Sequence, residues 1–199
     1  MSSNSMSAAQ LVRWRRTGIG LEVFTLVWNV VGVVLLAFLA IASSSVALLG
    51  FGLDSLIEIG ASTVVIWELT GVGEDRQRLA LRLIGWAFIA LAAYLLIQSG
   101  IALILAHRPT PLLGGVGWTA LTAVAMFSLA FGKAHTGRKL ANPVLTAEGR
   151  VTLIDGILAM SVLVGILLDL LFGWWWADPL AGLVIVFYAI REAVTIFRD

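Results

Sequence analysis

The sequence contains no cysteine and very little charge. Of its 199 residues, 13% are charged and 60% are hydrophobic, whereas a soluble globular chain has about a quarter charged and about half apolar residues. The lack of cysteine excludes disulfides, thiolate metal sites, covalent haem attachment and a cysteine nucleophile. The mean hydropathy of +0.99 leaves too few polar groups to cover a water-soluble surface. The composition therefore predicts a membrane protein.

Other absences narrow the function. The chain has two histidines, His107 and His135, so a metal site inside the membrane would be built mainly from oxygen ligands. The net charge is +1 and no basic run is interleaved with aromatic residues, which excludes a nucleic-acid groove. The sequence shows no nucleophile–base pair and no phosphate-binding loop. We expect no enzymatic activity and no prosthetic group.

The apolar runs predict an all-α, polytopic membrane fold. A helix needs about 20 mostly apolar residues to cross a bilayer, and Pro, Ser and charged clusters divide this chain into six such runs. A short N-terminal segment, residues 1–17, is expected to precede a six-helix domain, residues 18–199. The expected spans are 18–41, 46–69, 83–106, 115–131, 143–171 and 178–197. The breaks between them are Ser43–Ser45, a charged loop at 74–78, the prolines of 107–111 and a basic loop at 133–139. The last two helices are expected to start with a capping residue followed by proline, at Asn142-Pro143 and Asp178-Pro179.

The distribution of basic residues predicts the orientation. Eleven lysines and arginines flank the spans on the side of the termini, whereas Arg108 stands alone on the other side. The positive-inside rule then places both termini in the cytoplasm. The three tryptophans 174–176 fit an aromatic belt at the outer interface. We expect a multi-pass protein of the cytoplasmic membrane.

Carboxylates inside the expected spans are the strongest functional signal. A charge at the bilayer centre costs about 2.5–3.5 kcal/mol on insertion scales. Asp54 and Glu58 are spaced i and i+4 on one face of the second span, and Asp155 lies in the fifth. At 1.5 Å per residue, the pair lies about 12–18 Å from the start of its span and Asp155 about 18 Å from the start of its own. These three acids should therefore share one depth, and Glu148 shares a face with Asp155.

A divalent cation among these carboxylates is the economical explanation, because hard oxygen ligands bind such ions. The expected metal ligands are Asp54, Glu58 and Asp155, with Glu148 as a weaker candidate nearer the cytoplasm. A protonated acid that only joins two helices is the alternative. Glu22 is expected to pair with one of the nearby arginines. Asn29 is expected to hydrogen-bond a neighbouring helix, a role that we favour over ion binding.

Three segments resemble one family. SSSVALLGFGLDSLIE (43–58) is similar to the second transmembrane helix of the cation diffusion facilitator (cation efflux) family, TAEGRVTLIDGILAMSVL (146–163) to its fifth, and WADPLAGLVIV (176–186) to its sixth. The resemblance covers the chain from about Gly18 onward. It implies export of zinc or a related divalent ion, usually in exchange for protons, by a homodimer.

The resemblance also implies a ligand set and shows departures from it. The family's tetrahedral site corresponds here to Asp54, Glu58, Val151 and Asp155. Valine cannot ligate a metal, so position 151 is a vacancy in the pattern, and Glu58 replaces the commoner Asp. The His-rich loop is missing, and the usual cytoplasmic C-terminal domain is expected to be absent. An all-oxygen set leaves Zn, Mn, Fe and Co open as the transported ion.

Three functions remain open from the sequence. The leading hypothesis is a divalent-cation/proton antiporter whose partners are the metal ion, protons, the lipid bilayer and a second copy of the chain. The alternative is a non-transporting interaction or regulatory protein on the same scaffold, which Val151 favours. A proton-coupled exporter of small organic cations is the third, with faint support from the eight tryptophans.

Overall fold

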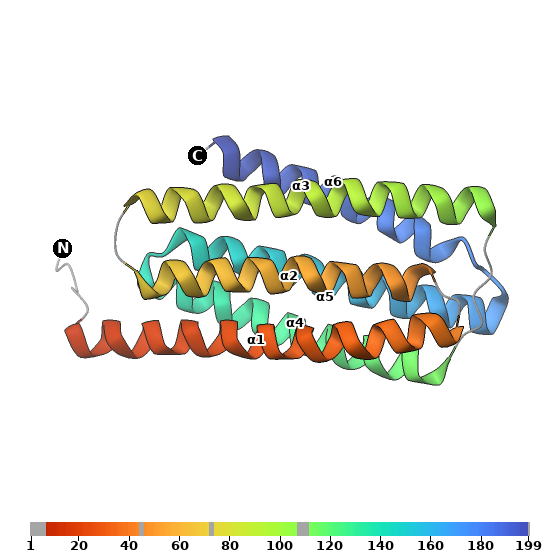
Figure 1. Ribbon diagram of the computed structural model, residues 1–199, viewed down its shortest axis with the longest axis horizontal. Helices are drawn as coiled ribbons and strands as arrows, with labels where there is room; N and C mark the ends of the chain where they lie inside the picture. The colour runs from red at the N-terminus through yellow and green to blue at the C-terminus, as the bar shows by residue number, and fades with distance from the viewer. Residues whose placement is uncertain (1–6, 44–45, 72–73, 107–111, 199) are drawn as a thin grey trace.

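The computed structural model describes residues 7–43, 46–71, 74–106 and 112–198. These residues form six α-helices, and no strand occurs among them (Figure 1). The helices are α1 (Ala8–Ser43), α2 (Val46–Thr70), α3 (Glu74–Leu105), α4 (Leu113–Leu140), α5 (Pro143–Phe172) and α6 (Ala177–Arg198). The predicted all-α fold is confirmed.

Four helices are long and apolar enough to cross a membrane. Within the described residues they are Ala8–Ala42, Arg78–Leu105, Leu113–Leu140 and Pro143–Phe172. Their outward surfaces suit lipid, since large apolar side chains such as Val34, Phe38, Ile104 and Phe131 are at least 70% exposed. These helices indicate a multi-pass membrane protein.

Local sequence signals set the two ends of α5. The Oδ1 atom of Asn142 accepts a 2.8 Å hydrogen bond from the backbone N–H of Leu145, with Pro143 at the start of the helix. This is the predicted cap-plus-proline start. At the other end, Gly173 adopts a left-handed conformation with φ of 69°, which glycine accepts without steric cost.

Three boundary predictions are wrong. Residues 74–78 are not a loop but the start of α3, where the acidic residue Asp75 lies near the partial positive charge of the helix N-terminus. Residues 133–139 are not a loop either, because α4 continues to Leu140 and buries Lys133. The helix α6 begins at Ala177, so Asp178 is not its cap. The predicted breaks at 44–45 and 107–111 lie outside the described residues.

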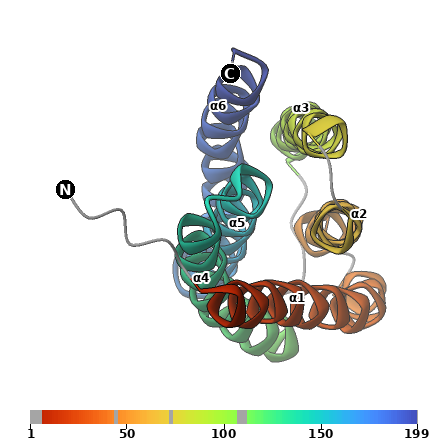
Figure 2. The ribbon, with the colours of Figure 1, turned by 90° about the vertical axis from the view of Figure 1, so that its left-hand side faces the viewer.

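The helices pack as a group of four with a pair beside it. In the end view of Figure 2, α1, α2, α5 and α4 surround a common interior, and each contacts its neighbours in that ring. The remaining helices, α3 and α6, pack on each other and on α5. All six run along the long axis of the molecule, with α6 the most oblique, and the start of α1 and the end of α6 lie toward the same side of the bundle (Figure 1). The interior of the four-helix group is therefore enclosed by protein.

Close contact between α4 and α5 depends on a small residue. A Cβ atom added to Gly149 would lie 2.9 Å from the backbone nitrogen of Ala134 and 3.3 Å from the carbonyl oxygen of Ala130. Only glycine leaves room for this approach. As a result, Lys133 on α4 lies directly beside Glu148 on α5.

Candidate metal centre

The interior of the four-helix group holds charged side chains rather than a purely apolar core. All four predicted metal ligands are buried there: Asp54 and Glu58 from α2, and Glu148 and Asp155 from α5. The inward facing of each side chain was therefore predicted correctly, and their role as metal ligands stays a prediction. The structure divides them into two groups, however, and does not gather all four around one point.

The first group is the pair Asp54 and Asp155. Their carboxyl groups lie close enough to interact electrostatically. Oδ2 of Asp54 and both carboxylate oxygens of Asp155 have no hydrogen-bond donor among the described residues. Two acids from separate parts of the chain thus face each other with unused oxygen lone pairs.

The second group surrounds Lys133. Its Nζ atom lies 3.0 Å from Oε2 of Glu22 on α1 and 3.1 Å from Oε1 of Glu148 on α5. It also donates a 2.8 Å hydrogen bond to the hydroxyl of Thr152. Lys133, Glu22 and Glu148 have side chains that are fully buried. We call this group, together with Thr152, the Lys133 cluster.

Glu58 joins the two groups. Its Oε1 accepts a 2.6 Å hydrogen bond from Thr152 and lies 3.7 Å from Nζ of Lys133. It is also near enough to Asp54 and Asp155 to interact with both electrostatically. Its Oε2 has no hydrogen-bond partner among the described residues. One oxygen of Glu58 is therefore held by the Lys133 cluster while the other stays available.

Glu148 lies in the Lys133 cluster and not with the aspartate pair. Its Oε1 accepts hydrogen bonds from Lys133 at 3.1 Å and from Ser62 at 3.4 Å. The prediction for Glu22 is wrong in its partner, because its carboxylate pairs with Lys133 and not with an arginine. The amide of Asn29 donates to the carbonyl of Thr25 on its own helix at 3.0 Å.

Lys133 was missed by the sequence analysis because it was assigned to a loop. A signal was nevertheless present. The buried positions of α4 recur at spacings of three and four residues through Met126, Leu129, Ala130, Lys133 and Gly137, which is the repeat of one helical face. Extending the helix beyond Phe131 would have placed this lysine on the inward face.

The arrangement falls short of a complete ligand shell. No three His, Asp or Glu side chains within the described ranges are positioned to hold one metal ion together. Val151, at the vacant position of the family pattern, is 4% exposed and belongs to the apolar core with Ile154 and Leu158. Two facing aspartates with one nearby glutamate are what the residues present offer to an ion.

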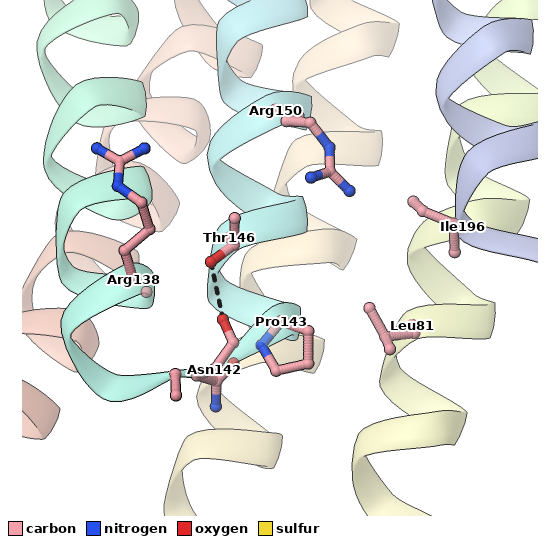
Figure 3. A pocket seen from close by; sticks show the side chains of 9 residues that line it. Leu81, Arg138, Asn142, Pro143, Thr146, Arg150 and Ile196 are labelled. Atoms are coloured by element: carbon pink, nitrogen blue, oxygen red, sulfur yellow. Dashed lines mark hydrogen bonds between the residues drawn. The ribbon is translucent and has the colours of Figure 1, made fainter. Parts of the chain in front are cut away.

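A separate pocket lies where α4 ends and α5 begins. It has a volume of about 450 Å³, and Figure 3 shows Arg138 and Arg150 on its wall, with Thr146 donating a 2.9 Å hydrogen bond to the carbonyl of Asn142. Its described lining residues include two arginines and no carboxylate. Such a lining offers no anionic ligand to a metal ion, so the pocket is not the candidate metal centre.

Comparison with known protein families shows which family the chain belongs to. The family model of the cation efflux transmembrane domain matches residues 78–199. The chain belongs to the cation efflux family. The matched part contains Asp155, Glu148 and Lys133, whereas Asp54, Glu58 and Glu22 precede it. No curated protein matches the chain.

Membership confirms the resemblance noted in the sequence. It places this cation efflux protein in a family of membrane transporters of metal cations. With its four long apolar helices, the protein is a multi-pass membrane protein whose transported substrate is a metal ion by family.

Proposed function

We propose that this cation efflux protein exports a divalent metal cation across the cytoplasmic membrane in exchange for protons. The observation that carries the proposal is the buried pair Asp54 and Asp155, which brings together one acid from α2 and one from α5. Two adjacent carboxylates cannot both stay ionised in a membrane interior unless a cation lies between them. A divalent ion or a proton satisfies the same pair.

The chemistry of the pair supports ion–proton exchange. Carboxylate oxygens bind hard and borderline divalent ions, which leaves Zn, Mn, Fe and Co as candidates. A protonated carboxylate is a poor ligand, so metal binding releases protons and protonation releases metal. Glu58 is the proposed third ligand through its available Oε2. Glu148 pairs with Lys133. We propose that it lies at the periphery of the metal site and is not a direct ligand in this conformation.

We further propose that all six helices cross the membrane, with both termini in the cytoplasm. The 25 residues of α2 and the 22 of α6 extend about 38 and 33 Å at 1.5 Å per residue, enough for a core of about 30 Å. With Lys133 buried, the predicted cytoplasmic side still holds nearly all the exposed basic residues, which supports the orientation.

A homodimer is proposed from family resemblance. Small residues such as the glycines near the start of α4 can allow close approach of helices from two copies. Two of them serve packing within the chain, because a Cβ on Gly114 would lie 3.0 Å from Leu39 and one on Gly115 would lie 3.3 Å from Leu48. Only Gly117 of the three has nothing within 4 Å among the described atoms. It is the position in this stretch that remains open to a second copy.

The deciding experiment compares metal binding and transport in reconstituted vesicles. Wild type, Asp54→Ala and Asp155→Asn are tested with a metal-sensitive dye, and Asp169→Asn serves as the control because it removes a carboxylate at the far end of α5. Loss of binding and transport in the first two variants, with the control unchanged, supports the proposal. If Asp155→Asn binds and carries metal as well as wild type, the pair only joins two helices.

A second candidate is a non-transporting membrane protein with an interaction or regulatory role. Two observations favour it: Val151 is packed in the apolar core, and Lys133 already neutralises part of the acidic cluster. This candidate requires that Zn²⁺, Mn²⁺, Fe²⁺ and Co²⁺ all leave the thermal stability of the purified wild type unchanged. Stabilisation by any of them that Asp54→Ala abolishes excludes it.

A further inference from the structure

The ammonium group of Lys133 is surrounded by oxygen atoms, as a bound metal cation would be. Its ammonium group has three N–H donors, and the structure gives it three close oxygen neighbours on Glu22, Glu148 and Thr152, at 2.8–3.1 Å. The group comes from α4, while its partners come from α1 and α5. The positive charge is therefore fixed at the junction of the four-helix group by the fold itself.

The charge of this region is not balanced by Lys133 alone. Three carboxylates, from Glu22, Glu58 and Glu148, lie within 4 Å of a single ammonium. Within the described residues, no lysine or arginine forms an ion pair with Asp54 or Asp155. Beyond the single positive charge of Lys133, the interior has capacity for additional cations or protons.

Glu58 is the carboxylate that both Lys133 and an ion on the Asp54–Asp155 pair can contact. Its Oε1 faces Thr152 and Lys133, and its Oε2 has no described partner. Among the described carboxylates, Glu58 is the one suited to be a third ligand of an ion on the Asp54–Asp155 pair, because it lies one helical turn from Asp54 on the same face. The ammonium group draws on the same carboxylate and repels a divalent charge nearby.

We propose that Lys133 is a resident cation that weakens the binding of the transported ion by competing with it for Glu58. The proposal rests on the proposed function of the Asp54–Asp155 pair. A transporter must bind its ion and also release it, and a divalent ion held by three ionised carboxylates in a dry interior would leave slowly. The fixed positive charge beside Glu58 keeps the ion's affinity low enough for release.

The test measures the affinity of the detergent-purified protein for Zn²⁺ and Mn²⁺ by calorimetry in wild type, Lys133→Gln and Lys133→Arg. Lys133→Gln removes the charge, and Lys133→Arg retains it. We expect Lys133→Gln to bind at least about tenfold more tightly than wild type, since a repulsive charge is lost near a divalent ion. Lys133→Arg should bind as wild type does. In vesicles, Lys133→Gln should also release metal more slowly.

A second variant guards against misfolding. Lys133→Gln leaves three carboxylates without their cation, whereas Lys133→Gln combined with Glu148→Gln keeps the total charge of the cluster unchanged. Tighter binding in the double variant supports the proposal, because Glu58 is freed from its competitor in both. Unchanged or weaker binding in either folded variant overturns it and makes Lys133 a purely structural counter-ion.

The outcomes separate this inference from the proposed function. If Asp54→Asn loses metal binding while Lys133→Gln binds like wild type, the function stands and the role of Lys133 is refuted. If neither wild type nor Lys133→Gln binds Zn²⁺, Mn²⁺, Fe²⁺ or Co²⁺, both proposals are wrong. Thermal unfolding without metal is measured in parallel, because a structural counter-ion would alter stability and leave metal affinity unchanged.

Discussion

The hydroxyl of Thr152 on α5 donates a 2.6 Å hydrogen bond to Oε1 of Glu58 on α2. The same hydroxyl accepts a hydrogen bond from Lys133 on α4 at 2.8 Å. A hydroxyl has a single proton to donate, and here that proton goes to Glu58 while a lone pair of the same oxygen accepts from Lys133. Thr152 thereby fixes one oxygen of Glu58 and leaves the other free to face the aspartate pair.

Replacing Thr152 with valine should destabilise the protein. The substitution keeps the side-chain shape and removes a buried hydroxyl that serves two charged groups, for which a loss of about 1–3 kcal/mol is typical. Thr152→Ser keeps the hydroxyl and is the matched control. The free energy of unfolding is measured by SDS titration in mixed micelles. A Thr152→Val protein as stable as wild type would show that this hydrogen bond contributes nothing.

Introducing histidine at position 151 should strengthen zinc binding. Val151 lies four residues before Asp155, on the face that points into the four-helix group, so an imidazole there can supply the nitrogen ligand missing from the set. Val151→Leu enlarges the side chain without a donor atom and controls for altered packing. Calorimetry with Zn²⁺ should show tighter binding for Val151→His only. Equal affinity in all three proteins would mean that position 151 does not face the ion.

Replacing Gly149 with alanine should destabilise the contact between α4 and α5. The new Cβ would lie 2.9 Å from the backbone nitrogen of Ala134, so the helices must move apart at a cost of about 1–3 kcal/mol. Gly100→Ala on α3, where nothing lies within 4 Å, should be neutral or slightly stabilising, because alanine favours helix. If both variants unfold at the same SDS concentration as wild type, the close approach at Gly149 is not required.

The proposed orientation can be tested with single cysteines, because the chain has none of its own. Ser7 and Trp176 are exposed and lie at opposite ends of the bundle. A membrane-impermeant maleimide should label Trp176→Cys in intact cells and Ser7→Cys only after permeabilisation. Labelling of Ser7→Cys in intact cells would place the N-terminus outside and reverse the topology.

The helices and the buried acids could be predicted from the amino-acid sequence alone. Apolar runs of about 20 residues define membrane helices almost independently of their neighbours, which is why six helices were expected in the right parts of the chain, although the start of α3, the end of α4 and the start of α6 were not predicted. The cap at Asn142 and the glycine at Gly173 are local signals, and both ends of α5 followed from them. Asp54, Glu58, Glu148 and Asp155 were identified because a charge in an apolar run is costly wherever the helix packs.

How those acids are paired could not be predicted, because it depends on the packing of helices that are distant in the sequence. Helical periodicity gives the face of each side chain on its own helix but not which faces of different helices meet. Lys133 illustrates this limit: next to Arg138 and Lys139 it is typical of a water-exposed loop, yet α4 continues past it and Gly149 lets α5 approach. Packing thus brought a lysine into the acidic interior, and it separated Glu148 from the aspartate pair because an ammonium attracts the nearest carboxylates of three helices.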